Sequence, residues 1–187
     1  MKSAKKILAL ILAGVMALAL LTGCGKATSL NRTIAEGFAE YFKSNLAANG
    51  LSNNISVSYQ VPELSRKIAP LFDENWIAYD TVNKWDVLNK NQMVNGKTVE
   101  ATLTDILSPY MSAPAVVFVA ADVTDVKTPF METSNLTESQ IGFRKVNVAS
   151  DEDGNNDFSS VTSMKIAVTH KTVNDRTYAL AVMVLEK

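Results

Sequence analysis

The sequence predicts an α+β fold, with N-terminal helices packed on a C-terminal, mostly antiparallel sheet in a single domain. Apolar residues recur at helical spacing in the first half of the chain, whereas alternating and continuous apolar runs dominate the last third. Helices followed by strands favour this class over the βαβ alternation of a parallel sheet. No internal repeat or low-complexity tract interrupts the 187 residues, so we expect one domain over residues 30–187.

The first helix is predicted over residues 31–48. Thr33 and Glu36 fit a capping box, in which a hydroxyl and a carboxylate satisfy free backbone donors at a helix start. Asn49 and Gly50 end the pattern, and there we expect a left-handed cap. The apolar residues that define the buried face are Ile34, Phe38, Tyr41 or Phe42, and Leu46.

The middle of the chain predicts a strand and two short helices. Residues 55–61 alternate strictly between apolar and polar, which indicates a strand with one solvent-exposed face. Pro62 suits the first position of a following helix, and Pro70 limits the length of that helix. Residues 73–97 are expected to be irregular, with a short helix. Residues 99–110 restore a helical apolar stripe.

The later strands are predicted from longer apolar runs. Residues 115–121 form a continuous apolar run that suits a buried strand. Residues 141–148 are also apolar but change parity between Phe143 and Val146, which indicates a bulge or a bend.

The end of the chain predicts an antiparallel hairpin. Residues 164–168 alternate between apolar and polar, whereas residues 178–185 are apolar on both parities, as in a central strand. Asn174 and Asp175 supply the chemistry of a turn between them. We therefore expect these two strands to pair across residues 171–176.

The segment before the domain resembles a bacterial lipoprotein signal. Three lysines precede an apolar run of about fifteen residues, 7–21, as in the charged and hydrophobic regions of an export signal. This run is shorter than the roughly 20 residues that a membrane-spanning helix needs. The four residues that follow the pattern of a lipobox are Leu21, Thr22, Gly23 and Cys24.

This resemblance implies a lipoprotein precursor. In that family the signal, here residues 1–23, is cleaved just before the cysteine, whose thiol carries a diacylglycerol with palmitate-type chains. Cys24 is the only cysteine, so no disulfide is expected within the chain. Residues 24–29 are expected to be a short tether. The expected partner is a membrane, reached through the lipid on Cys24, at the cell surface or a periplasmic face.

Composition excludes several classes of function. Removal of residues 1–23 leaves 164 residues with 15 basic and 19 acidic side chains, a net charge of about −4. A chain of this sign has no electrostatic reason to bind nucleic acid. The domain is also small for a two-lobed solute-binding protein. The sequence lacks the local motifs of serine hydrolases, P-loop proteins, dinucleotide-binding domains and zinc proteases, and no cofactor is expected.

One acidic stretch is a candidate calcium site. Calcium takes six to eight oxygen ligands from flexible loops, and Asp151, Asp153, Asn155 and Asp157 supply several. The spacing departs from the EF-hand pattern, because glycine falls at the fourth position instead of the sixth. The alternative, which we favour, is a solvated connection between strands, since Asp, Asn and Gly are turn residues.

Three aromatic residues form a candidate ligand-binding patch. Trp76, Tyr79 and Trp85 lie within ten residues of one another among polar neighbours. Aromatic faces stack on the apolar faces of sugars, so an envelope glycan is a candidate ligand. The alternative is that these rings pack in the core, where aromatic side chains bury the most area, and we favour the core for them.

His170 is the only histidine. A catalytic histidine needs an orienting acid and a nucleophile, and a zinc site needs further nitrogen or sulfur ligands. The mature chain has no other imidazole, and its only thiol is the one predicted to be lipidated. We therefore expect a surface or partly buried histidine and no metal site, and the alternative is a carboxylate-rich metal site that includes this one histidine.

A second resemblance concerns the globular domain. Asn-Gly-Leu at residues 49–51, Pro-Glu-Leu-Ser at 62–65 and Ile-Ala at 68–69 are similar to the opening of a CAP-superfamily domain, the family of cysteine-rich secretory proteins, antigen 5 and plant pathogenesis-related proteins. That family begins with a helix, a Gly-Leu turn, an extended piece and a second helix, and it ends on antiparallel strands. Its cleft is typically lined by two histidines, whereas this chain has one. The resemblance covers about a fifth of the chain, assigns no site residue and implies a degenerate CAP-like domain.

These observations predict a lipid-anchored bacterial cell-envelope protein. Its domain is expected to bind a ligand, such as an envelope glycan, or a partner protein, without catalysis. The alternative is a cell-envelope hydrolase whose site is assembled from carboxylates and hydroxyls that are distant in the sequence. A hydrolase needs at least two convergent titratable groups with shifted pKa values in one cleft, whereas a binding domain does not.

Overall fold

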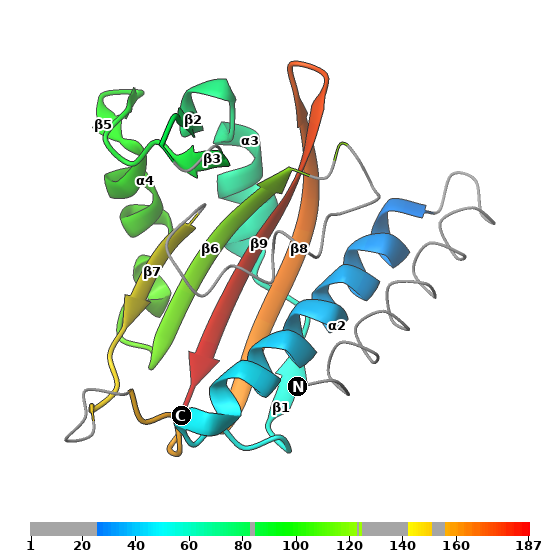
Figure 1. Cartoon of the computed structure of the whole chain (residues 1–187), viewed down its shortest axis with the longest axis vertical. Coiled ribbons are helices and arrows are strands. Elements are labelled where there is room, and N and C mark those ends of the chain that lie inside the picture. The colour runs from blue at the N-terminus through cyan, green and yellow to red at the C-terminus, as the bar shows by residue number, and fades with distance from the viewer. Residues whose placement is uncertain (1–25, 83–84, 123, 125–141, 151–155) are drawn as a thin grey trace.

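The computed structural model describes residues 26–82, 85–122, 124, 142–150 and 156–187. In these ranges a five-stranded sheet lies between one long helix on one face and a layer of shorter helices on the other (Figure 1). The sheet is mixed but mostly antiparallel, which confirms the predicted α+β class. None of the helices in the described ranges is both long enough and apolar enough to cross a bilayer.

The strand order of the sheet is β1-β8-β9-β6-β7. Only the β1–β8 pair is parallel, and the other pairs are antiparallel. β9 lies at the centre and is almost entirely buried, which explains why its sequence is apolar on both parities. The strands are β1 (Ser56–Ser58), β6 (Ala115–Asp122), β7 (Gly142–Val146), β8 (Ser163–Val173) and β9 (Arg176–Glu186).

One face of the sheet is covered by helix α2 (Lys26–Leu46), followed by η1 (Ala47–Asn49). Ile34, Phe38 and Ala39 are buried there against alternate residues of the strands, so the predicted helical stripe is confirmed. Gly50 ends the helical region with a φ angle of 86°, as predicted for a left-handed cap.

The structure corrects the predicted start of this helix. α2 already begins at Lys26, so residues 26–29, the part of the predicted tether that the structure describes, are helical. Thr33 consequently lies inside the helix, and the predicted capping box is wrong. Glu36 instead accepts a hydrogen bond of 2.7 Å from Arg32 Nε, one helical turn earlier.

The opposite face is covered by the helical segment of residues 62–71 and by α4. Pro62 opens this segment as predicted. Its middle is the π-helical η2, an unusual geometry that inserts one extra residue into the turn. The helical elements of this layer are η2 (Leu64–Ile68), α3 (Ala69–Leu71), η3 (Glu74–Trp76), α4 (Val99–Ile106) and η4 (Ser108–Tyr110).

Three local predictions need correction. The strand predicted over residues 55–61 is only the three residues of β1, because the chain turns away to begin the next helix at Pro62. β7 pairs with β6 in unbroken register, so the predicted bulge between Phe143 and Val146 is wrong. The segment predicted to be irregular contains two short hairpins, formed by β2 (Ile77–Asp80) with β3 (Trp85–Leu88) and β4 (Met93–Val94) with β5 (Lys97–Thr98).

The C-terminal hairpin is confirmed and is longer than predicted. β8 and β9 pair along their whole length, from Ser163 opposite Glu186 to Val173 opposite Arg176. The two turn residues, Asn174 and Asp175, have φ angles of 47° and 62°, as a type I′ turn requires at both central positions. This turn forms one end of the long axis of the molecule (Figure 1).

Candidate functional site: a groove at the edge of the sheet

A groove of about 630 Å³ lies along the edge strand β1. Its walls come from α2, from β1 and the residues after it, from η4 and from β8, elements that are far apart in the sequence. The polar and aromatic residues that line it are Arg32, Ser58, Tyr59, Gln60, Tyr110 and Lys165.

The parallel pairing of β1 and β8 positions the first cation of the groove. Ser58 stands in register with Lys165, so their side chains lie on the same face of the sheet. Lys165 Nζ lies 2.6 Å from Glu186 Oε1 on β9, while Ser163 Oγ donates to Oε2 of the same carboxylate at 3.3 Å. The glutamate therefore holds the ammonium group in place and neutralises its charge.

Tyr110 forms the wall of the groove above this ion pair. Its ring centroid lies 5.8 Å from Lys165 Nζ, within the range of a cation–π contact. Its hydroxyl donates a hydrogen bond of 2.8 Å to Glu63 Oε2. Burial, assisted by the hydrogen bond to Glu63 and by the negative charges of Glu63 and Glu186, raises the pKa of Tyr110 to about 12. The phenol therefore stays protonated and acts as a hydrogen-bond donor.

A second aromatic–cation pair lies at the other side of the groove. The guanidinium carbon of Arg32 lies 3.5 Å above the centroid of the Tyr59 ring. Burial, with a contribution from the charge of Glu36, raises the pKa of Tyr59. Arginine has five N–H donors, and among the described contacts Glu36 takes the one on Nε.

The groove therefore combines aromatic surface with paired donors and acceptors. Arg32 and Lys165 each lie beside a carboxylate, so neither cation gives the groove a strong positive charge. The two tyrosines have raised pKa values, which makes them weaker acids and leaves even less of the nucleophilic phenolate form at neutral pH. This arrangement is suited to hydrogen bonding of a polar ligand and not to activation of a nucleophile.

His170 lies elsewhere, on the face of the sheet that α2 covers. Its Nδ1 contacts Asn31 Oδ1 on that helix. Burial lowers the pKa of His170 from its usual 6.5, because the charged form loses solvation between helix and sheet. The histidine thus joins α2 to β8, as expected for a partly buried residue. In the described ranges, no three or more His, Cys, Asp or Glu residues gather in a group that could hold a metal ion.

The buried histidine predicts a pH dependence of stability. Because the pKa of His170 is lower in the folded protein, the unfolded chain takes up a proton first as the pH falls. The stabilisation is complete above about pH 6.5 and is lost below it, until the folded histidine is also protonated. We expect the free energy of unfolding, measured in urea, to fall between about pH 7.5 and about pH 5. The variant His170→Gln should show a smaller fall, and an equal fall would contradict this assignment.

Trp76, Tyr79 and Trp85 do not form one exposed patch, because Trp76 is buried. Trp76 is fully buried and packs against Phe72 and Phe118, so its indole belongs to the core and cannot stack on a ligand. Tyr79 is 57% exposed on β2, and the side chain of Trp85 lies outside the described part of the structure. Trp76 therefore packs in the core, as the favoured alternative predicts for this residue.

The candidate calcium site is largely outside the described residues. Asp151, Asp153 and Asn155 lie outside them, whereas Asp157 is described. The Oδ1 atom of Asp157 accepts a hydrogen bond of 2.9 Å from the backbone of Ser159, and this bond holds the pKa of Asp157 below its usual range. Asp157 therefore stabilises a turn, as the alternative interpretation predicts for this residue.

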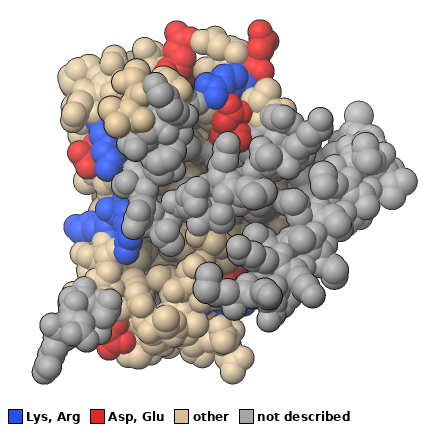
Figure 2. All heavy atoms as spheres, in the orientation of Figure 1, with Lys and Arg blue, Asp and Glu red and all other residues tan. Residues whose placement is uncertain are grey.

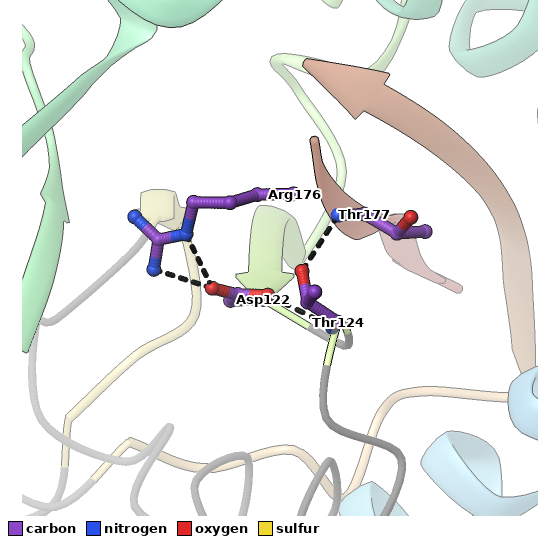
Figure 3. A network of polar contacts seen from close by, with 4 residues as sticks. All are labelled: Asp122, Thr124, Arg176 and Thr177. Carbon is purple, nitrogen blue, oxygen red and sulfur yellow. Dashed lines mark hydrogen bonds and ion pairs between the residues drawn. The ribbon is translucent and has the colours of Figure 1, made fainter. Parts of the chain in front are cut away.

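A further polar network joins the end of β6 to the start of β9 (Figure 3). Asp122 Oδ2 accepts a hydrogen bond of 2.7 Å from Arg176 Nε, and Oδ1 accepts one of 2.9 Å from the backbone of Thr124. Thr124 Oγ1 in turn accepts from the backbone of Thr177 at 2.7 Å. Burial raises the pKa of Asp122, but the hydrogen bonds from Thr124 and Arg176 outweigh it and lower the pKa. Since its carboxylate is occupied by these donors, we interpret the network as a structural clamp.

A second, more open hollow of about 520 Å³ lies beside the β8–β9 turn. Asn174 donates to the carboxylate of Glu74 across one side of it, and its other polar lining residues include Lys171 and Asn95. Its polar groups are thus partly used for contacts between the turn and its neighbours. We regard the groove at β1 as the better candidate site because two tyrosines, each beside a cation, line it.

The residues of the groove were not identified from the sequence. Ser58 and Lys165 become neighbours only through a parallel strand pair, and Tyr110 reaches Glu63 from a different helical element. No local motif marks such contacts. The one available signal was the strand prediction for residues 55–61, which indicated that polar side chains would line an exposed strand.

Comparisons with known proteins give no match to the chain, whether with protein families, with curated proteins or with solved structures. The resemblances to a lipoprotein signal and to the CAP superfamily therefore stay predictions. The function is inferred from the chemistry of the residues themselves.

Proposed function

We propose that this protein is a lipid-anchored component of a bacterial cell envelope whose groove along β1 binds an envelope glycan without catalysis. The anchoring rests on the lipobox resemblance of residues 21–24 and on the charged and apolar segment before it. Cys24 itself lies outside the described residues. The fold adds a compact domain that follows this cysteine almost directly.

The observation that carries the binding role is the combination of two tyrosines with paired charged groups in one groove. Tyr59 and Tyr110 offer ring surface, and Arg32, Lys165 and Glu63 offer donors and acceptors at defined positions. Sugars present apolar ring faces edged by hydroxyl groups, which donate and accept hydrogen bonds. A mostly apolar or aromatic wall with a few fixed polar groups is the usual composition of a small-ligand site.

The hydrolase alternative fits this groove less well. A catalytic acid or base works best when its pKa lies near the pH of the reaction. The raised pKa of Tyr110, about 12, moves this residue away from that range. We therefore favour binding over hydrolysis for the groove.

Calorimetric titration with soluble peptidoglycan glycan strands tests this proposal. The variant Tyr110→Phe removes one hydroxyl and should weaken binding about fivefold, the equivalent of one hydrogen bond of about 1 kcal/mol. Tyr59→Ala, which removes a ring and the platform of Arg32, should weaken it further. Tyr79→Phe, at an exposed position outside the groove, is the matched control and should bind like the wild type.

Absence of heat with the wild-type protein would contradict the glycan-binding role. Equal affinities of the wild type and both groove variants would show that a glycan binds at some other surface. Thermal unfolding of each variant checks that a loss of binding does not come from a loss of structure.

A further inference from the structure

The cysteine predicted to be lipidated is joined closely to the folded domain. α2 begins at Lys26, two residues after Cys24, and two extended residues span at most about 7 Å. The helix buries Ile34, Phe38 and Ala39 against the sheet. It therefore cannot swing away from the domain without exposing core side chains to water, which is strongly unfavourable.

The direction of α2 defines which end of the domain lies near this cysteine. Asn31, near the start of α2, contacts His170 in the second half of β8. Beyond the other end of the helix, the carbonyl of Asn49 accepts a hydrogen bond of 2.8 Å from the backbone of Phe158, shortly before β8 begins. α2 and β8 thus run in opposite directions, and the start of α2 lies toward the β8–β9 turn (Figure 1).

The β8–β9 turn and the start of α2 both extend beyond the contact between Asn31 and His170, in the same direction. From His170 to Asn174 the strand rises by about 13 Å, at about 3.3 Å per residue. From Asn31 back to Lys26 the helix rises by about 7.5 Å, and the two remaining residues add up to about 7 Å. A lipid on Cys24 would therefore bring the β8–β9 turn to the surface of the bilayer.

We propose that the end of the domain with Asn174 and Asp175 at its tip rests on the headgroups of the bilayer that holds the lipid of Cys24. This inference rests on the lipid anchoring of the proposed function. The bilayer is expected to contact this end because the chain that carries the proposed lipid joins the domain there.

The described charges at this end are mostly acidic, because Asp73, Glu74, Asp122 and Asp175 outnumber Lys171 and Arg176. Arg176 is paired with Asp122, and Glu74 accepts a hydrogen bond from Asn174. On the face shown in Figure 2, acidic and basic side chains are interspersed at the end that carries the turn. The contact therefore depends on the anchor and not on attraction to anionic lipids, and on zwitterionic phosphatidylcholine we expect it to be insensitive to salt.

This orientation also places the groove. Lys165, in the groove, and Asn174, at the turn, are separated by nine residues of β8, or about 30 Å. The end of the groove at Lys165 would then lie well above the headgroups, whereas Arg32, next to Asn31, lines the end nearer to the turn.

Site-specific fluorescence quenching tests the orientation in the full lipidated protein. Because the thiol of Cys24 is consumed by the lipid, Asp175→Cys introduces a single free thiol at the turn for a fluorescent label. The matched control is Asn53→Cys, an exposed residue in the loop that follows α2 and precedes β1. Both proteins are placed in phosphatidylcholine vesicles that carry a quencher on the headgroups.

We expect quenching at position 175 to exceed that at position 53 several-fold, at low and at high salt. Equal quenching at both positions, or stronger quenching at 53, would overturn the orientation. Flotation of the vesicles separates this failure from failure of the anchoring. Protein that floats but is quenched equally retains its anchor without a fixed orientation, whereas protein that does not float overturns both proposals.

Discussion

Replacement of Trp76 by alanine is expected to lower the free energy of unfolding by about 3–5 kcal/mol. The indole is fully buried, and its centroid lies 5.8 Å from that of Phe72 and 6.3 Å from that of Phe118. Truncation removes this packing and leaves a cavity between the helical layer and the sheet. Urea denaturation of the wild type and the variant measures the loss.

Two further variants make this test specific. Trp76→Phe keeps most of the packing and removes the indole N–H, which has no hydrogen-bond partner among the described residues. It should cost less than Trp76→Ala, because an unsatisfied buried donor is itself unfavourable by about 1–3 kcal/mol. Tyr79→Ala, at an exposed site, should stay within about 0.5 kcal/mol of the wild type. A stable Trp76→Ala protein that loses glycan binding would contradict the assignment of Trp76 to the core.

Replacement of Cys24 by serine is expected to abolish lipid attachment. A thioether requires the sulfur, and Cys24 is the only cysteine in the chain. Cells grown with a clickable palmitate analogue should label the wild-type protein strongly and the variant only at background. The variant should also migrate as the larger precursor, because cleavage before residue 24 follows lipid attachment in lipoproteins.

The neighbouring variant Lys26→Ala is the matched control for this experiment. It changes the first residue of α2 and leaves the lipobox intact, so it should be labelled and processed like the wild type. Labelling that persists in Cys24→Ser would show that acyl chains are attached elsewhere and would contradict the lipobox assignment.

Short sequence patterns correctly predicted those elements whose conformation depends only on residues that are adjacent in the sequence. Gly50 ends the first helical region in a left-handed conformation, and Asn174 with Asp175 forms the hairpin turn, because both features depend on the φ angles that these residues tolerate. The central strand β9 was recognisable from its continuous apolar run, because both of its faces are buried.

The same reasoning failed where the conformation of a segment depends on residues outside that segment or where the segment is very short. Thr33 and Glu36 have the spacing of a capping box, but the helix already runs through them from Lys26. The short hairpins of β2–β3 and β4–β5 carry too few residues for a period to be visible.

The candidate site was beyond local prediction for a different reason. The groove depends on the parallel pairing of β1 with β8, which brings Ser58 beside Lys165, and on the contact of Tyr110 with Glu63. Such contacts follow from the topology of the sheet and the packing of helices on it. The sequence shows which residue types are present, but it does not show that these residues lie side by side in the folded protein.

Intact mass spectrometry of the native protein extracted in detergent tests the central claim, a lipid-anchored envelope domain, most directly. We predict a chain that begins at Cys24 and carries the added mass of a diacylglyceryl group, with or without a further acyl chain on its amino terminus. A chain that still contains residues 1–23, or a Cys24 with an unmodified thiol, would contradict the account.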